Sequence, residues 1–201
     1  VMCFSSYPTF RHQIFPDYKL NRINKPKPYG LKAAINNVKN EYNSVFYENL
    51  EGDDVLGLCA TNGRYDDPII VSVDKDMRTI PAIHCSIIDN QFEKVDEQLA
   101  DYNFCTQVLT GDQTDGYKGC QGVGHVKAGR LLDVKKSLDE NWDKVIAEYL
   151  RNKYTVDDAY RQSRLARILR HGEYNKKTKK PKLWSYKYAK YKNTRPNKKT
   201  A

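Results

Sequence analysis

The run PIIVSVDKD, residues 68–76, constrains the fold more than any other part of this sequence. Its β-branched apolar residues are almost continuous, and they are Ile69, Ile70, Val71 and Val73. Strands that are buried on both faces of a parallel sheet have runs of this kind, whereas strands with one solvent-exposed face alternate apolar and polar residues. The sequence therefore predicts a parallel sheet covered by helices, with Asp74 and Asp76 at the end of this strand.

Strands and helices alternate around this run, and helices alone follow it. From apolar periods and helix-capping residues we expect strands at 1–5, 44–49 and 68–76, and helices at 30–43, 50–62, 94–109, 123–132, 138–152 and 155–170. Residues 7–30 have no sustained period and contain four prolines, which is typical of a loop. This order predicts an α/β domain followed by a helical module.

The positive charge is concentrated at the C-terminus. From His171 onward there are ten lysines and one arginine against Glu173, a net charge of +10, so the total of +9 leaves residues 1–170 at −1. We expect a hairpin or a loosely ordered tail here. The lysines around residues 176–182 and the tyrosines that follow could neutralise phosphates and stack on bases, or they could form a solvated tail.

The five cysteines are an odd number without a C-x-x-C pair, which argues against a disulfide framework and against a zinc ribbon. We therefore expect a reducing compartment, the cytoplasm. No apolar stretch is long enough to span a bilayer, and no signal peptide opens the chain, so no membrane partner is expected.

Three groups of acids stand out. They are Glu51, Asp53 and Asp54; Asp74 and Asp76; and Asp112 and Asp115. Taken singly, each could be a helix cap or a solvated loop. The first two groups fall where ligands bind in open α/β sheets, at the carboxyl edge. A joint cluster would need cations, and carboxylates without His or Cys favour Mg²⁺ or Mn²⁺. Such clusters around two ions are typical of phosphodiester hydrolysis.

Other motifs fail on the stretch from Gly111 to Gly124. An EF-hand with Gly116 in sixth place would have Gly122 where the glutamate should stand. A phosphate-binding loop needs G-K-[ST], but Gly116 is followed by Tyr117 and Lys118, and the third glycine of a dinucleotide turn is missing.

The order of the motifs resembles the structure-specific 5′ nucleases, which include flap endonucleases, the 5′-nuclease domain of bacterial DNA polymerase I and, most closely, phage 5′-3′ exonucleases. The matching segments are Y-K-L-N-R (18–22), E-G-D-D (51–54), V-S-V-D-K-D-M (71–77), and T-G-D-Q-T-D-G with G-C-Q-G-V-G (110–124). The resemblance continues from R-I-L-R-H-G-E-Y to K-L-W at residues 167–184.

This resemblance implies a mostly parallel central sheet flanked by helices, a helical arch at about 12–43 and a helix-hairpin-helix module. The domains would be an α/β nuclease core at 1–109, a metal loop and DNA-binding helical region at 110–170, and a basic tail at 171–201. It implies two ions, one held chiefly by Glu51, Asp53 and Asp54, and the other by Asp74, Asp76, Asp112 and Asp115.

The resemblance also implies DNA contacts. Lys19 and Arg22 would be catalytic arch residues at the scissile phosphate, with Tyr18 beside them, or alternatively part of an ordinary solvated loop. The hairpin backbone at Gly119, Gly122 and Gly124, with Lys127, would face duplex phosphates, and a K⁺ ion often accompanies such a hairpin. Glycine suits this role because its backbone can approach a phosphate closely.

The sequence departs from the family pattern in its first metal site. The family begins with a strand that carries a metal-binding aspartate, for which Val1 leaves no room upstream, and Ser6 stands where a second acid is expected. We therefore expect this chain to be weakly active or inactive unless the missing first strand is provided.

The preferred function is a Mg²⁺-dependent 5′-3′ exonuclease or flap endonuclease that acts as a monomer. Its partners would be duplex DNA with a 5′ end or flap, or an RNA–DNA hybrid. The alternative is a catalytically impaired DNA-binding fragment of such a nuclease, and a third hypothesis is a toxin-type ribonuclease, which would lack the hairpin glycines.

Overall fold

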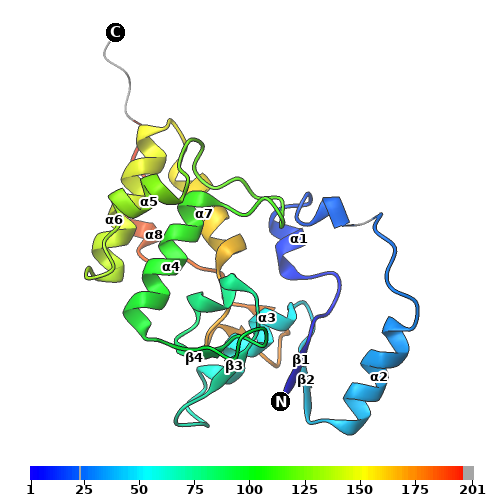
Figure 1. Ribbon diagram of the computed structural model, residues 1–201. Helices are drawn as coiled ribbons and strands as arrows, with labels where there is room; N and C mark the ends of the chain where they lie inside the picture. The colour runs from blue at the N-terminus through cyan, green and yellow to red at the C-terminus, as the bar shows by residue number, and fades with distance from the viewer. Residues whose placement is uncertain (23, 197–201) are drawn as a thin grey trace.

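The computed structural model describes residues 1–22 and 24–196, which form an α/β part and a helical part (Figure 1). The α/β part contains, in order, β1 (Met2–Phe4), α1 (Phe10–Ile14), η1 (Leu20–Arg22), α2 (Leu31–Glu41), β2 (Ser44–Phe46), α3 (Gly52–Ala60), β3 (Ile69–Val71), η2 (Lys75–Thr79), β4 (Ala82–Cys85) and β5 (Phe92–Val95). The helical part follows with α4 (Glu97–Thr110), α5 (His125–Leu131), α6 (Leu138–Arg151) and α7 (Val156–Ala166). The chain then forms β6 (Tyr174–Asn175), β7 (Lys180–Pro181) and α8 (Tyr188–Tyr191).

The strands form small separate sheets. β1 and β2 pair in parallel, with Met2 opposite Ser44. β3 and β4 also pair in parallel, with Ile69 opposite Ile83, whereas β5 pairs antiparallel to β4. The helix α3 contacts β1, β2 and β3, so it joins the two sheets from one side. The expected parallel pairing is confirmed, but the single central sheet is divided between β1 and β3.

The predicted burial of residues 68–76 on both faces is wrong. Within β3 only Ile70 is buried, while Ile69 and Val71 remain 54% and 56% exposed. The cause is the position of β3, which lies at the edge of its sheet with β4 on one side only. An apolar cavity of about 370 Å³ lies between the two sheets, lined on one side by Val1 and Cys3 and on the other by Ile69 and Ile70.

Residues 6–43, expected to be a loop followed by a helix, contain two further short helices. Thr9 and the side chain of His12 cap the start of α1, and Phe10 anchors it in the core. The predicted helix at 30–43 forms as α2, which has no buried residue and extends away from the remainder of the molecule (Figure 1). We call residues 12–43 the arch, after the name that the family resemblance gives to this segment.

The largest core cluster lies in the helical part. Trp142, Tyr149, Tyr160 and Phe104 are fully buried where α4, α6 and α7 pack on one another. Capping boxes fix the two later helices: Ser137 with Glu140 begins α6, and Thr155 with Asp158 begins α7. α7 ends at Ala166, earlier than predicted.

The residues after 170 form ordered structure as far as 196. A two-stranded hairpin, β6–β7, comes first, and the segment 183–192 then crosses the helical part with Trp184 packed against Phe104 and Trp142. The prediction of a hairpin is confirmed, whereas the alternative of a loose tail is wrong for these residues. In residues 1–22 and 24–196 no helix combines the length and the apolar character that crossing a bilayer requires.

Candidate active site

The first group of acids begins α3. Glu51 occupies the N-cap position, and its backbone N–H donates to Asp54 Oδ2 at 3.2 Å. Asp53 and Asp54 follow in the first turn, where the helix dipole favours negative charge. The chain thus presents Glu51 and Asp53 at the carboxyl ends of the strands, as the sequence predicts.

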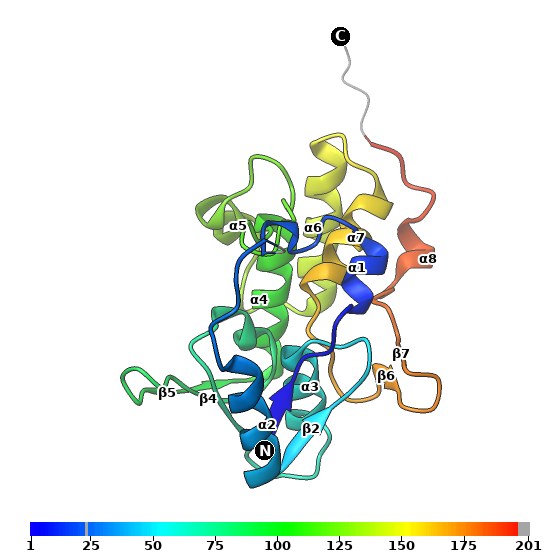
Figure 2. The ribbon, with the colours of Figure 1, turned by 90° about the vertical axis from the view of Figure 1, so that its right-hand side faces the viewer.

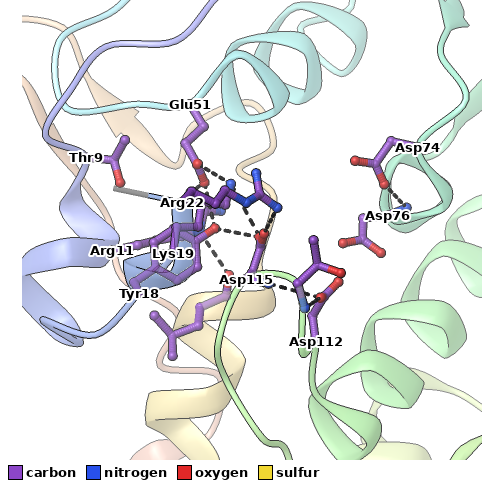
Figure 3. A network of polar contacts seen from close by, with 12 residues as sticks. Thr9, Arg11, Tyr18, Lys19, Arg22, Glu51, Asp74, Asp76, Asp112 and Asp115 are labelled. Atoms are coloured by element: carbon purple, nitrogen blue, oxygen red, sulfur yellow. Dashed lines mark hydrogen bonds and ion pairs between the residues drawn. The ribbon is translucent and has the colours of Figure 1, made fainter. Parts of the chain in front are cut away.

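Three residues of the arch, Tyr18, Lys19 and Arg22, contact acids of the first and third groups. The Tyr18 hydroxyl lies 2.8 Å from Glu51 Oε2 and 2.9 Å from Asp115 Oδ2, so its one proton can be donated to either carboxylate. Lys19 Nζ is 2.5 Å from Glu51 Oε1 and 3.4 Å from Asp115 Oδ2, and Arg22 Nη2 is 2.7 Å from Asp115 Oδ1. Figure 3 shows these side chains converging from the arch and from the loop after α4.

The backbone holds this arrangement as well. Lys19 donates its N–H to the carbonyl oxygen of Asp115 at 2.9 Å, and it adopts a left-handed conformation with φ of 56°. Asp112 fixes the other side, because its Oδ1 accepts the backbone N–H groups of Thr114 and Asp115. The arch and the loop at residues 111–117 are therefore joined independently of the ion pairs.

Electrostatics within the site are uneven. Burial acts to raise the pKa of Glu51, but the adjacent Arg11 and Lys19 outweigh it and hold that pKa below its usual value. Burial, Glu51 and Asp54 raise the pKa of Asp53 to about 6. The side facing the arch is thus compensated by cations, while Asp53 retains an excess of negative charge around it.

The second group shows the same excess. Asp74 and Asp76 follow β3, where Asp74 Oδ1 accepts the N–H of Asp76 at 2.9 Å. Burial, Asp74 and Asp112 raise the pKa of Asp76 to about 7. In Figure 3 the carboxylates of Asp74 and Asp76 point toward the space in front of Asp112. The acids of the second and third groups are therefore electrostatic neighbours.

Asp54 lies deeper than the other acids. It is fully buried and forms a bidentate ion pair with Arg11, with distances of 2.6 and 2.9 Å. It also accepts the backbone N–H of Leu169 at 3.2 Å. Both of its oxygens are therefore engaged with the protein, whereas Asp74 accepts a hydrogen bond through Oδ1 alone among the described residues.

The donor set fits a hard divalent cation in its chemistry. All seven predicted ligands offer carboxylate oxygens, and the raised pKa values of Asp53 and Asp76 mark negative charge that a cation would relieve. Among the described residues, however, no three His, Cys, Asp or Glu side chains come together closely enough to hold an ion. Three of the acids instead have cationic partners, because Arg11, Lys19 and Arg22 form ion pairs with Glu51, Asp54 and Asp115.

The glycine-rich hairpin divides into a packed part and an open part. A Cβ on Gly119 would lie 2.3 Å from the nitrogen of Gly111 and 2.5 Å from the carbonyl oxygen of Leu109. The backbone N–H of Gly119 donates to the side chain of Gln162. Gly119 therefore serves backbone packing. Gly122 and Gly124 have open space at their Cβ positions.

The structure does not confirm the predicted helix-hairpin-helix module. α5 follows Gly124 directly, but residues 112–117 form a turn closed by backbone hydrogen bonds between Asp112 and Tyr117. Lys127 Nζ lies 2.9 Å from Glu148 Oε1, so its charge is partly compensated.

Arg11 is the functional candidate that the sequence did not reveal. Besides Asp54 it contacts Glu51 Oε2 at 3.2 Å and donates to the carbonyl oxygens of Leu165 and Arg167. Arg11 lies in a short helix that is outside all three groups of acids. The only local signal that marks it in the sequence is its position two residues after the helix cap, Thr9. Its partners are 40 to 156 residues away in sequence, so local patterns carry no sign of them.

Two phage exonucleases are similar to this chain over most of its length. The chain is 29% identical to the exodeoxyribonuclease of Enterobacteria phage T3, with 92% of this chain and 72% of that protein covered. It is also 29% identical to the exonuclease of Escherichia phage T7, with 92% and 73% covered.

Solved structures show the same fold. The flap endonuclease of bacteriophage T5, in a complex with DNA and metal ions, superposes with a TM-score of 0.53 at 17% identity, over 78% of this chain and 69% of that one. The family model described as the 5′-3′ exonuclease, N-terminal resolvase-like domain, matches residues 1–107. With that match over the α/β part, the chain belongs to the 5′-3′ exonuclease family of nucleases.

Proposed function

We propose that this protein is a divalent-metal-dependent 5′-3′ exonuclease and flap endonuclease that hydrolyses DNA phosphodiesters. The observation that carries this proposal is the convergence of Tyr18, Lys19 and Arg22 from the arch on the carboxylates of Glu51 and Asp115. A solvated loop would have no reason to hold three such side chains against two partly buried acids. The chain would act as a monomer in the host cytoplasm, in phage replication, recombination or breakdown of host DNA.

The seven acids would hold two ions, Mg²⁺ or Mn²⁺. Glu51, Asp53 and Asp54 would serve chiefly one of them, with Asp54 acting through its buried pair with Arg11, and Asp74, Asp76, Asp112 and Asp115 would serve the other. When bound, such ions lower the pKa of water and stabilise charge on phosphate oxygens. The raised pKa values of Asp53 and Asp76 support this assignment, because burial and neighbouring carboxylates disfavour the charged form of both acids when no cation is bound.

The arch residues would position the phosphate. Lys19 and Arg22 now neutralise Glu51 and Asp115, and a phosphate placed at the same point would offer both side chains a second anionic partner. Tyr18 is 2% exposed and fixes the start of this segment, so the two cations are presented from a held backbone. Gly122 and Gly124 would approach the duplex, Lys127 would lie near its phosphates, and a K⁺ ion would bind at this hairpin.

A further strand between the two sheets belongs to the same proposal. β1 and β3 are both edges of parallel pairs, and they line opposite sides of an apolar cavity of about 370 Å³. Exposed Ile69 and Val71 would be covered by a strand inserted there. Such a strand would restore the single sheet that the run at 68–76 predicts.

The test is cleavage of a 5′-labelled DNA flap with Mg²⁺, in comparison with the same reaction in chelator. We expect cleavage by the parent and its loss in Asp112→Asn and Asp115→Asn. Asp66→Asn, an exposed acid in the loop before β3, is the control and should cleave like the parent. Cleavage that persists in chelator would contradict metal dependence.

The same assay separates the impaired-fragment alternative. DNA binding without cleavage by this chain, with cleavage restored when a segment supplying the first strand is added, would favour the fragment. Full Mg²⁺-dependent activity of the 201-residue chain alone would refute it. Substrates with an RNA–DNA hybrid 5′ strand extend the assay to the second proposed partner.

A further inference from the structure

The β6–β7 hairpin carries positive charge that the proposed active site does not use. Between Tyr174 and Lys182 the sequence has five lysines and no acidic residue. All five side chains are exposed, and they are Lys176, Lys177, Lys179, Lys180 and Lys182. Exposed charges of one sign at this density repel one another and favour an anionic partner.

The hairpin is held in one place beside the site. Asn175 Oδ1 accepts the backbone N–H groups of Lys177 and Thr178, which fixes the turn. The Tyr174 hydroxyl donates to the carbonyl oxygen of Glu48 at 3.0 Å, three residues before Glu51. Figure 2 shows β6 and β7 beside α3 and β2, on the side away from the β4–β5 hairpin.

The ion pairs divide the lysines of the C-terminal region into two sets. In the hairpin, Lys179 pairs with Glu48 and Lys176 lies over the ring of Tyr47. Within residues 1–22 and 24–196, no carboxylate pairs with the three remaining ammonium groups, those of Lys177, Lys180 and Lys182. Further along, by contrast, Lys187 pairs with Asp139 and Lys190 with Asp143.

The unpaired lysines also share a surface. A hollow of about 640 Å³ is lined by nine residues, none of them acidic. Besides Lys176, Lys177, Lys180 and Lys182, the lining includes Asn175 and Thr178, which can also contact an anion. Lysine is a point charge on a flexible stem, so such a surface fits a row of phosphates without regard to base sequence.

We propose that the β6–β7 hairpin binds the phosphate backbone of duplex DNA through Lys177, Lys180 and Lys182. The proposal rests on the proposed function, because it takes the substrate to be DNA. Duplex DNA carries one negative charge per about 1.7 Å of its axis, and each phosphate that a lysine neutralises releases counterions. The hairpin would hold the duplex from the side of Glu48, away from the arch and the glycine hairpin.

The test compares two variants of equal charge. One replaces Lys177, Lys180 and Lys182 by Gln. The control replaces Lys136, Lys187 and Lys190 by Gln, three exposed lysines that are each paired with an acid. Binding to a blunt duplex of about 30 base pairs is measured by fluorescence anisotropy in chelator, at salt concentrations from about 50 to about 200 mM.

We expect the hairpin variant to bind DNA more weakly than the parent. Its plot of log binding constant against log salt concentration should also be less steep, by about 0.9 for each phosphate that is no longer neutralised and by up to about 2.7 in all. The control should keep the parent's slope. Equal slopes in all three proteins, or an equal loss in both variants, would overturn the proposal. So would unchanged DNA binding together with a loss of binding to anionic phospholipid vesicles, which would assign the surface to a membrane.

This measurement is independent of cleavage. If the parent fails to cut DNA but the salt dependence of DNA binding is still less steep in the hairpin variant, the proposed activity fails and the binding surface stands. If the parent cleaves with Mg²⁺ and the hairpin variant binds like the control, the surface fails and the activity stands.

Discussion

At the scale of single residues, the acids of the site differ in their partners more than in their chemistry. Glu51 and Asp115 are compensated by Lys19 and Arg22, whereas Asp53 and Asp76 face other carboxylates. Carboxylates that face each other destabilise a metal-free protein, and the same repulsion makes a cation favourable. If Asp53 and Asp76 hold metal ions as proposed, function and stability are therefore opposed at these two positions.

Asp76 allows this opposition to be measured. Burial and Asp74 raise its pKa in the folded protein to about 7, so its contribution to stability is complete below the ordinary value and is lost as pH rises toward 7. We expect Asp76→Asn to stabilise the metal-free protein at pH 8 by roughly 1 kcal/mol, or about 2 to 4 °C, while cleavage is lost.

The measurement is thermal unfolding in chelator at pH 5 and pH 8, with Asp66→Asn as the control. The gain of Asp76→Asn over the parent should be larger at pH 8. A gain in stability that is equal at both pH values, or a loss of stability at pH 8, would show that ionised Asp76 does not destabilise the folded protein.

At the scale of elements, one side chain links three helices. Arg11 in α1 pairs with Asp54 in α3 and donates to the carbonyl oxygens of Leu165 in α7 and Arg167 just after it. The arch begins at α1, so this buried pair sets where Tyr18, Lys19 and Arg22 meet the acids.

Removal of Arg11 should therefore cost far more than removal of an exposed arginine. We expect Arg11→Met to lower the free energy of unfolding by about 3 to 5 kcal/mol, because it leaves Asp54 buried and unpaired. Adding Asp54→Asn should recover part of this loss. The control is Arg130→Met on the exposed face of α5, and the measurement is denaturant unfolding in chelator. A loss below about 1 kcal/mol for Arg11→Met would contradict this role.

At the scale of the whole molecule, the site is made by two parts of the chain. Glu51 and Asp74 come from the α/β part, and Asp112 and Asp115 come from the loop after α4, in the helical part. A ligand that binds both sets links the two parts, and it stabilises the folded state by mass action.

Mg²⁺ or Mn²⁺ should therefore raise the melting temperature of the whole chain. At a hundredfold excess over Kd the gain is about 2.7 kcal/mol, which corresponds to roughly 5 to 10 °C for a chain of this size. Differential scanning fluorimetry with rising metal concentration measures it. We expect Asp112→Asn to reduce the shift and Asp66→Asn to preserve it, and a parent with no shift would count against a metal site made by both parts.

The sequence by itself determined the local structure and the chemistry of the acids. The predicted helices formed at α2 to α7 because apolar period and capping residues are local signals, and the acids before α3 and after β3 lie where strand ends must place them. Ordered motifs also identified the family, since the chemistry of a site fixes residue types and their sequence order.

The tertiary structure alone decided the partners. That Arg11 pairs with Asp54, that β3 is an exposed edge, and that Lys187 is compensated while Lys177 is not all depend on contacts between distant segments. The physical reason is that an ion pair or a buried face needs two surfaces to meet in space. The sequence determines which interactions each residue can form, but the packing of the chain determines with which partner it forms them.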